Sequence, residues 1–294
     1  MKKTAFVLLS ALLTAPAFAA DVVNIYSFRQ PFLIQPILDD FTKQTGIKTN
    51  VVFAKKGLIE RVKREGKHSK ADLVLTSNFS ALIQLEDLGL TQSINSDVVN
   101  ANVPSTFRDA DGQWIALTKR VRNVYSSKER VGALAELTYE DLADPKYKGK
   151  ICTRSGKHPY NLGLVASMVA HHGEAKTKQW LEGVKANLAR KPQGNDRAQV
   201  KAVKEGLCDL ALGNSYYFGK MMQDEQQKSW AEAVYINFPN QTNRGSHVNV
   251  SGVVMTRYAK NPENALKLIE YMTDNKAQNM YASVNMEYPV KQGV

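Results

Sequence analysis

From residue 23 onward, the chain alternates strand-like and helix-like segments. Residues 23–25 alternate apolar and polar side chains as a half-buried strand does, and the apolar positions of residues 32–41 follow helical spacing. Residues 51–53 and 71–76 are again strand-like, and residues 58–66 between them are helix-like. Such repeated β-α units predict an α/β fold whose ligand sites lie beyond the carboxyl ends of the strands.

The second half of the chain repeats this alternation. Residues 150–153 and 208–212 are predicted strands, and residues 195–205 are a predicted helix. A strand-like run at 248–255 is then followed by a helix that begins at Pro262. A chain of 294 residues is long enough for two compact lobes, each with its own core.

The expected domain organisation follows from these segments. We expect a signal peptide at 1–19, a first lobe at 20–118 with a return segment at about 243–275, a second lobe at 119–242, and a C-terminal segment at about 276–294 that could pack on the second lobe. The polar segment 118–123 is the expected crossover between the lobes.

The N-terminus has the features of a cleavable secretory signal. Lys2 and Lys3 precede an apolar run that ends at the small-residue pattern Ala17-Phe18-Ala19. No later segment reaches about twenty apolar residues, the length that a membrane-spanning helix needs. We therefore expect an exported, soluble protein with no membrane insertion, and the bacterial periplasm is the favoured location. Removal of the two lysines lowers the formal net charge from +11 to +9.

Export decides how the only two cysteines are interpreted. An oxidising compartment favours a disulfide between Cys152 and Cys208. The alternative is a redox or metal-binding pair, but no second pair of cysteines completes a zinc pattern.

The basic composition does not by itself choose between nucleic acid, an acidic surface and an anionic ligand. The chain has no zinc-finger spacing and no aromatic-basic RNA motif, so we expect no nucleic-acid partner. It also lacks the GxSxG, Walker A, GxGxxG and HExxH patterns of common enzyme classes. We therefore predict that the protein is not an enzyme.

Three tyrosines are the candidate metal ligands. Tyr216 and Tyr217 follow a strand-like run, and Tyr160 follows another in the same half of the chain. A phenol ionises only near a pKa of about 10 in water, so clustered phenols at strand ends indicate either ordinary packing or a strong, hard electrophile such as ferric iron. Three phenolates would balance the three charges of Fe³⁺. Packing of the rings in a core is the alternative.

Three protein oxygens leave a ferric octahedron incomplete, so an anion or water must complete it. Arg29, Gln30 and Arg120 are the candidate anion-binding residues, because guanidinium groups donate paired hydrogen bonds to oxyanions. Arg154 is a weaker candidate. His158 would be either an accessory site residue or a residue that orients the loop before Tyr160.

Several longer segments carry a family resemblance. They are Tyr26-Ser27-Phe28-Arg29-Gln30-Pro31, Arg154-Ser155-Gly156-Lys157-His158-Pro159-Tyr160-Asn161, Lys191-Pro192-Gln193-Gly194-Asn195-Asp196, Gly213-Asn214-Ser215-Tyr216-Tyr217, His247-Val248-Asn249-Val250-Ser251-Gly252 and Glu287-Tyr288-Pro289-Val290. With them, nearly the whole mature chain resembles the periplasmic ferric-ion-binding proteins of iron ABC transporters.

The resemblance implies a bilobed type II periplasmic-binding-protein fold that closes around Fe³⁺ and a synergistic anion, often carbonate or bicarbonate. Tyr160, Tyr216 and Tyr217 match the family's iron-ligand tyrosines. Some relatives have a His-Tyr ligand pair where this chain has Gln30-Pro31, which favours the three-tyrosine, anion-assisted branch. The implied partner is an inner-membrane ABC permease driven by a cytoplasmic ATPase, and the implied state is a monomer.

Two other functions remain open at this point. The same architecture could serve as a receptor for an anion or a polyamine. A secreted hydrolase is the enzyme alternative, although the sequence shows no catalytic arrangement.

Overall fold

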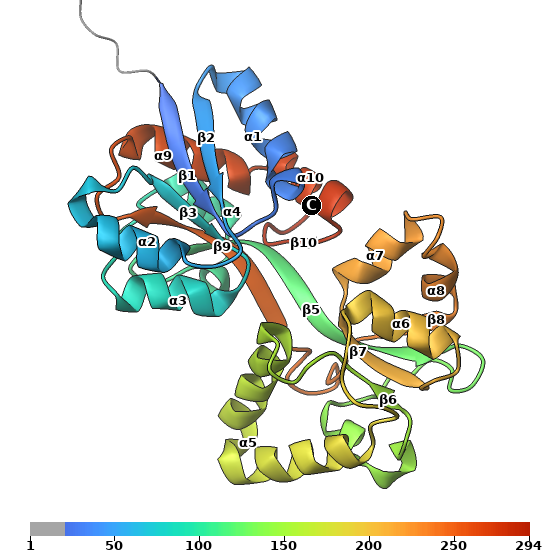
Figure 1. Ribbon diagram of the computed structural model, residues 1–294. Coiled ribbons are helices and arrows are strands. Elements are labelled where there is room, and N and C mark those ends of the chain that lie inside the picture. The colour runs from blue at the N-terminus through green and yellow to red at the C-terminus, as the bar shows by residue number, and fades with distance from the viewer. Residues whose placement is uncertain (1–20) are drawn as a thin grey trace, which may run out of the picture.

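The computed structural model describes residues 21–294, so the predicted signal peptide at 1–19 lies outside the described part of the chain. The first lobe is built on three parallel strands, with β1 between β2 and β3 (Figure 1). Its first elements are β1 (Val22–Ser27), α1 (Pro31–Thr45), β2 (Lys48–Phe53), α2 (Leu58–Glu65), β3 (Leu73–Thr76), α3 (Phe79–Asp87), β4 (Thr91–Gln92) and α4 (Asp97–Asn102). The repeated β-α units predicted from the sequence are therefore present.

Local sequence explains where these helices start and stop. Pro31 occupies the first turn of α1, where the lack of a backbone N–H costs nothing. Gly46 ends the helix in the left-handed conformation, at φ 75°, and its N–H bonds the carbonyl of Thr42. Because β1 ends at Ser27 and α1 begins at Pro31, Arg29 and Gln30 lie in the short loop at the strand's carboxyl end.

The second lobe is formed by the middle of the chain. Its elements are β6 (Ile151–Cys152), α5 (Pro159–Ala186), α6 (Asp196–Lys204), β7 (Leu210–Asn214), α7 (Tyr216–Met222), α8 (Lys228–Glu232) and β8 (Val234–Asn237). Residues 139–145, which have helix-like spacing, form short 3₁₀ turns at Glu140–Ala143 and Pro145–Tyr147 instead of an α-helix. Helix α5 has a kink at Gly173, where φ is 76°.

Two long strands connect the lobes (Figure 1). Strand β5 (Ile115–Ser127) pairs with β9 (Val248–Thr256) along residues 115–121 and with β7 along residues 122–126. Because one strand belongs to both sheets, the segment 118–123 lies inside β5 at the junction of the lobes. The sheet order is β2-β1-β3-β9-β5-β7-β6.

Each lobe has its own apolar core. In the first lobe, Ile25, Leu73 and Leu268 belong to one large cluster of buried side chains. In the second lobe, Val124 and Leu210 belong to one cluster and Tyr125 and Ala211 to another, so adjacent strand residues face opposite sides of the sheet.

The C-terminal segment packs differently from the prediction. Helices α9 (Pro262–Thr273) and α10 (Asn275–Asn285) and strand β10 (Tyr288–Pro289) follow β9. Tyr281 and Val290 are buried in the core of the first lobe, and the Gln278 side chain donates to the carbonyl of Leu117 at 3.0 Å. The segment touches the second lobe at its edge, where Lys220 Nζ donates to the Val284 carbonyl at 2.5 Å. Helical spacing alone cannot say which of two cores an apolar face joins.

The predicted disulfide is confirmed. Cys152 and Cys208 are bonded, with their Cα atoms 5.9 Å apart. The bond joins β6 to the residue pair that precedes β7, so it braces the strand that leads to Tyr216 and Tyr217. Among residues 21–294, no helix is both long and apolar enough to cross a membrane.

Replacing both cysteines by serine should lower the free energy of unfolding by about 2–5 kcal/mol, because the unfolded chain loses a loop constraint. Urea denaturation of the oxidised wild type and the Cys152→Ser/Cys208→Ser variant measures this difference. The reduced wild type is the control and should match the variant. An unchanged denaturation midpoint in the variant would contradict a stabilising role for the bond.

Candidate metal and anion site

All six predicted site residues line one cleft. Tyr160, Tyr216 and Tyr217 come from the second lobe, Arg29 and Gln30 from the loop after β1, and Arg120 from β5. The cavity between them has a volume of about 310 Å³. This is room for a metal ion together with a small polyatomic anion or water.

The three phenols form a compact group. The hydroxyls of Tyr160 and Tyr216 are 3.3 Å apart, and the ring centroids of Tyr216 and Tyr217 are 4.1 Å apart. All three side chains are half-buried. Burial, and then the neighbouring phenols, raise the pKa of Tyr216 well above its usual value, while Arg120 opposes this shift. Burial also raises the pKa of Tyr217. Tyr216 and Tyr217 are therefore neutral in the metal-free protein at neutral pH.

The ends of two helices and a strand position these tyrosines. Tyr160 is the second residue of α5, after Pro159 at the first position. Tyr216 opens α7 directly after β7 ends at Asn214. His158 caps α5: its Nδ1 accepts from the Tyr160 N–H at 3.2 Å, and its ring lies edge-on to the Tyr160 ring with centroids 4.6 Å apart. His158 thus orients the loop, which was one of its two predicted roles.

A buried ion pair contacts both chain segments that carry the three tyrosines. Arg122 Nη1 donates to Asp196 Oδ2 at 2.7 Å and to Asn214 Oδ1 at 3.0 Å, and Arg122 Nη2 donates to Asn161 Oδ1 at 2.6 Å. Asn161 adjoins Tyr160, and Asn214 precedes Tyr216 by two residues. One guanidinium on β5 therefore fixes the spacing of the two tyrosine segments.

The two arginines predicted to bind the anion already donate hydrogen bonds to groups of the protein. The two terminal nitrogens of Arg29 donate to the two carboxylate oxygens of Glu287 at 3.2 and 3.0 Å. Arg120 Nη2 donates to the carbonyls of Ser77 and Val250. Arg154 does not line the cleft; its Nη1 lies 3.2 Å from Asp196 Oδ1, and its guanidinium carbon is 5.4 Å from the Tyr160 ring centroid.

Several cleft residues were missed by the sequence analysis. Arg197, Lys220, Ser77, Asn285 and Glu287 also line the cavity. Ser77 directly follows β3, so it lies where ligand sites were expected, beyond the carboxyl end of a strand. Glu287 is 258 positions from Arg29, and no local pattern links them. Tyr26, in the same strand that leads to Arg29, does not line the cavity; its hydroxyl donates to the Glu65 carboxylate.

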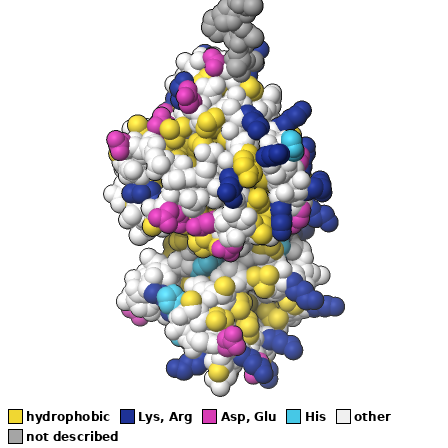
Figure 2. All heavy atoms as spheres, turned by 90° about the vertical axis from the view of Figure 1, so that its left-hand side faces the viewer, with side chains coloured by type: hydrophobic (Ala, Val, Ile, Leu, Met, Phe, Trp, Pro, Cys, Tyr) yellow, Lys and Arg dark blue, Asp and Glu magenta, His cyan; other side chains and the backbone are white. Residues whose placement is uncertain are grey.

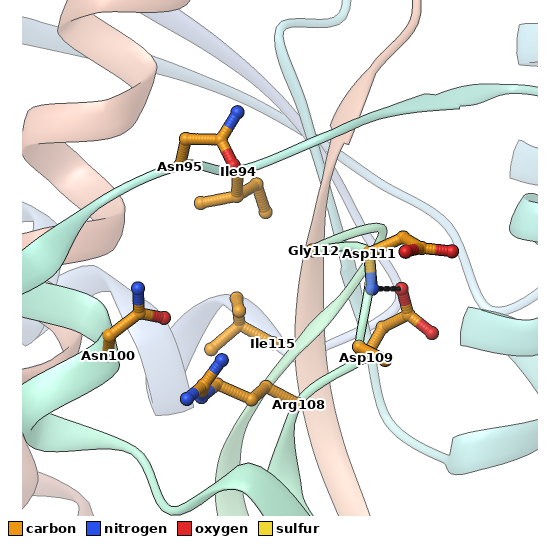
Figure 3. Close-up of a pocket in the computed structure, with 9 residues that line it drawn as sticks. Ile94, Asn95, Asn100, Arg108, Asp109, Asp111, Gly112 and Ile115 are labelled. Carbon is orange, nitrogen blue, oxygen red and sulfur yellow. Dashed lines mark hydrogen bonds between the residues drawn. The ribbon is translucent and has the colours of Figure 1, made fainter.

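Two other cavities have linings less suited to a hard metal ion. A cavity of about 330 Å³ in the first lobe includes Asp109 and Asp111 (Figure 3), but Asp109 Oδ2 accepts from the Asp111 and Gln113 N–H groups at 2.8 and 3.1 Å. A groove of about 770 Å³ lies between α3 and α5 and is largely apolar, with Phe79 and Leu162 on its walls. Figure 2 looks onto that side, where basic side chains are distributed over both lobes. Among residues 21–294, no cluster of three His, Cys, Asp or Glu side chains could hold a metal ion.

Residues 68–294 match the family model described as bacterial extracellular solute-binding protein. The chain belongs to this family. Iron uptake protein A1 of Synechocystis sp. is 44% identical over 275 residues, which are 92% of this chain and 76% of that relative.

Solved structures of family members have the same fold. Apo ferric ion-binding protein A of Pasteurella haemolytica is 56% identical, with a TM-score of 0.88 over 94% of this chain and 86% of that one. A Trichodesmium protein in complex with iron and citrate is 40% identical, with a TM-score of 0.88 over 93% of this chain and 87% of that one. The predicted bilobed type II periplasmic-binding-protein fold is confirmed.

Asp196→Ala should lower the free energy of unfolding by about 3–5 kcal/mol, because it leaves Arg122 as an uncompensated buried charge. Asp209→Ala is the matched control: its partner Arg130 is 33% exposed, and its loss should cost about 0–1 kcal/mol. Urea denaturation compares the two variants. Equal losses would contradict a special role for the buried pair.

Proposed function

We propose that this chain is a periplasmic solute-binding protein that captures ferric ion with a synergistic anion and delivers it to an inner-membrane ABC permease for iron uptake. The observation that carries the proposal is the grouping of three phenols and three guanidiniums in one cleft between two lobes. The iron-related names of the family members that this chain resembles support the same cargo.

Tyr160, Tyr216 and Tyr217 supply three hard oxygen ligands in this proposal, and as phenolates they balance the charge of Fe³⁺. The anion occupies remaining coordination positions and contacts Gln30, Arg120 and Arg29. Four cationic side chains and one carboxylate line the cleft, namely Arg29, Arg120, Arg197, Lys220 and Glu287. With the metal charge neutralised by phenolates, this surplus of positive charge is suited to an anion such as carbonate or bicarbonate.

Capture and release follow from the two-lobe architecture. The tyrosines and Arg29 lie on different lobes, so closure about β5 and β9 would bring the ligands and the anion contacts together and remove water from the metal. A binding protein of this kind carries out no reaction of its own, and its predicted partner is the permease with its cytoplasmic ATPase. The predicted signal peptide at 1–19 supports a periplasmic location, and we expect a monomer.

A receptor for another small solute is the alternative. The excess of cationic side chains in the cleft disfavours a polyamine and leaves a simple anion as the competing ligand. Three adjacent phenols are not needed to bind a simple anion, so the tyrosines favour ferric ion.

Titration of the metal-free protein with chelated ferric ion in bicarbonate buffer should give stoichiometric binding and a visible phenolate-to-iron absorption band. Tyr216→Phe/Tyr217→Phe should lose most of this band and weaken binding by at least about a hundredfold, because two charged ligands are removed. Tyr258→Phe, at an exposed tyrosine outside the cleft, is the matched control.

Normal ferric binding by the double variant would exclude the proposed ligands. The same titration without bicarbonate tests the anion, since a spectrum and affinity that do not depend on bicarbonate would contradict the synergistic-anion proposal.

Ferric binding should weaken as pH falls. Burial raises the pKa of Tyr216 and Tyr217, so each carries its proton before binding and releases it when the metal binds. Each released proton lowers the affinity by about tenfold per unit of decreasing pH. Proton release on addition of a ferric chelate in weakly buffered solution measures the stoichiometry. Tyr217→Phe should release one proton fewer, and an unchanged count would contradict phenolate formation at this residue.

A further inference from the structure

Arg29 is already engaged by a carboxylate inside the cleft. Its side chain is 2% exposed and that of Glu287 is 5% exposed, and both terminal nitrogens of the guanidinium donate to the carboxylate. Arg29 Nε is buried and has no hydrogen-bond partner among the described residues. Nε–H is therefore a buried donor with no protein partner, and each terminal nitrogen also keeps a second N–H.

Glu287 is held in place from several directions. It follows Met286, which caps α10 in the left-handed conformation at φ 57°, and it precedes β10, which pairs with β5 at Thr118 and Lys119. Thr118 Oγ1 donates to Glu287 Oε2 at 2.6 Å. A non-glycine residue at positive φ is uncommon, so this turn is determined by its packing. The turn directs Glu287 into the cleft and not into solvent.

The carboxylate remains ionised in this environment. Burial alone would raise the pKa of Glu287, but Arg29, Arg120 and the hydrogen bond from Thr118 together lower it below its usual value. The groups that act on Glu287 thus include two cations and a hydroxyl donor, and Lys220 and the Tyr281 phenol also interact with it. A charged carboxylate and a charged guanidinium form a neutral pair at the anion side of the cleft.

We propose that Glu287 is a specificity-determining residue of the anion site, because it holds Arg29 and cancels its charge. The cations left for a bound anion to neutralise are then Arg120, Arg197 and Lys220. This inference rests on the proposed ferric and anion site. Through Glu287, the turn between α10 and β10 sets how much positive charge a bound anion meets. The intramolecular carboxylate then keeps the metal-free site from holding an anion tightly.

The test is calorimetric titration of the iron-free mature protein with bicarbonate alone. Glu287→Gln should raise the affinity for bicarbonate by at least about tenfold, because it leaves the charge of Arg29 uncompensated in a buried site. Glu60→Gln is the matched control, since it makes the same change of charge at an exposed position on α2 and should leave the affinity unchanged. An unchanged or lower affinity in Glu287→Gln would overturn the proposal.

The double variant Arg29→Gln/Glu287→Gln provides a second test that does not depend on the single variant folding. It replaces the ion pair by two amides and leaves neither buried charge without its partner. It should not bind bicarbonate more tightly than the wild type, because it removes the charge that Glu287→Gln leaves uncompensated. A tenfold gain of affinity in this double variant would show that the gain does not come from the freed charge of Arg29 and would overturn the proposal.

Iron is absent from these titrations, so failure of the tyrosines to bind ferric ion would not alter their outcome. If the wild type binds ferric ion and Glu287→Gln gains no affinity for bicarbonate, this inference fails and ferric capture stands.

Discussion

The buried ion pair between Arg122 and Asp196 is the interaction on which the site depends. Taking two charges out of water is costly unless each is paired and hydrogen-bonded. Here the two terminal nitrogens of the guanidinium bond Asp196, Asn161 and Asn214, while Nε has no partner among the described residues. Those two amides belong to the segments that carry the tyrosines. The requirement to satisfy one buried cation therefore fixes the beginning of α5 relative to the end of β7.

The same arginine lies on the strand that both lobes share. Residues 115–121 of β5 pair with β9, and residues 122–126 pair with β7, so Arg122 begins the part of the strand that belongs to the second lobe. Arg120, two positions earlier, faces the cleft. Metal ligands and anion contacts thus meet at a single stretch of backbone, and a movement of one lobe relative to the other changes the distance between them.

Local patterns predicted much of this arrangement. Periodicity located β1, α1, β7 and β9, because a side chain's burial follows from its position in a strand or helix. The expectation of ligand sites beyond the carboxyl ends of strands pointed to the loops that carry Arg29 and the tyrosines, and the two cysteines were correctly paired. The C-terminal segment was assigned to the wrong core, because an amphipathic helix shows that it packs but not against what.

The sequence by itself determined the α/β class, the disulfide and the chemical types of the candidate ligands, since these depend on short-range periodicity and on residue chemistry. Only the tertiary structure decided which charges meet. Glu287 and Arg29 are 258 positions apart, and Arg122 reaches partners 39 to 92 positions away. Such contacts arise because β5 and β9 run from one lobe to the other and the chain then returns to the first lobe. No local sequence pattern encodes them.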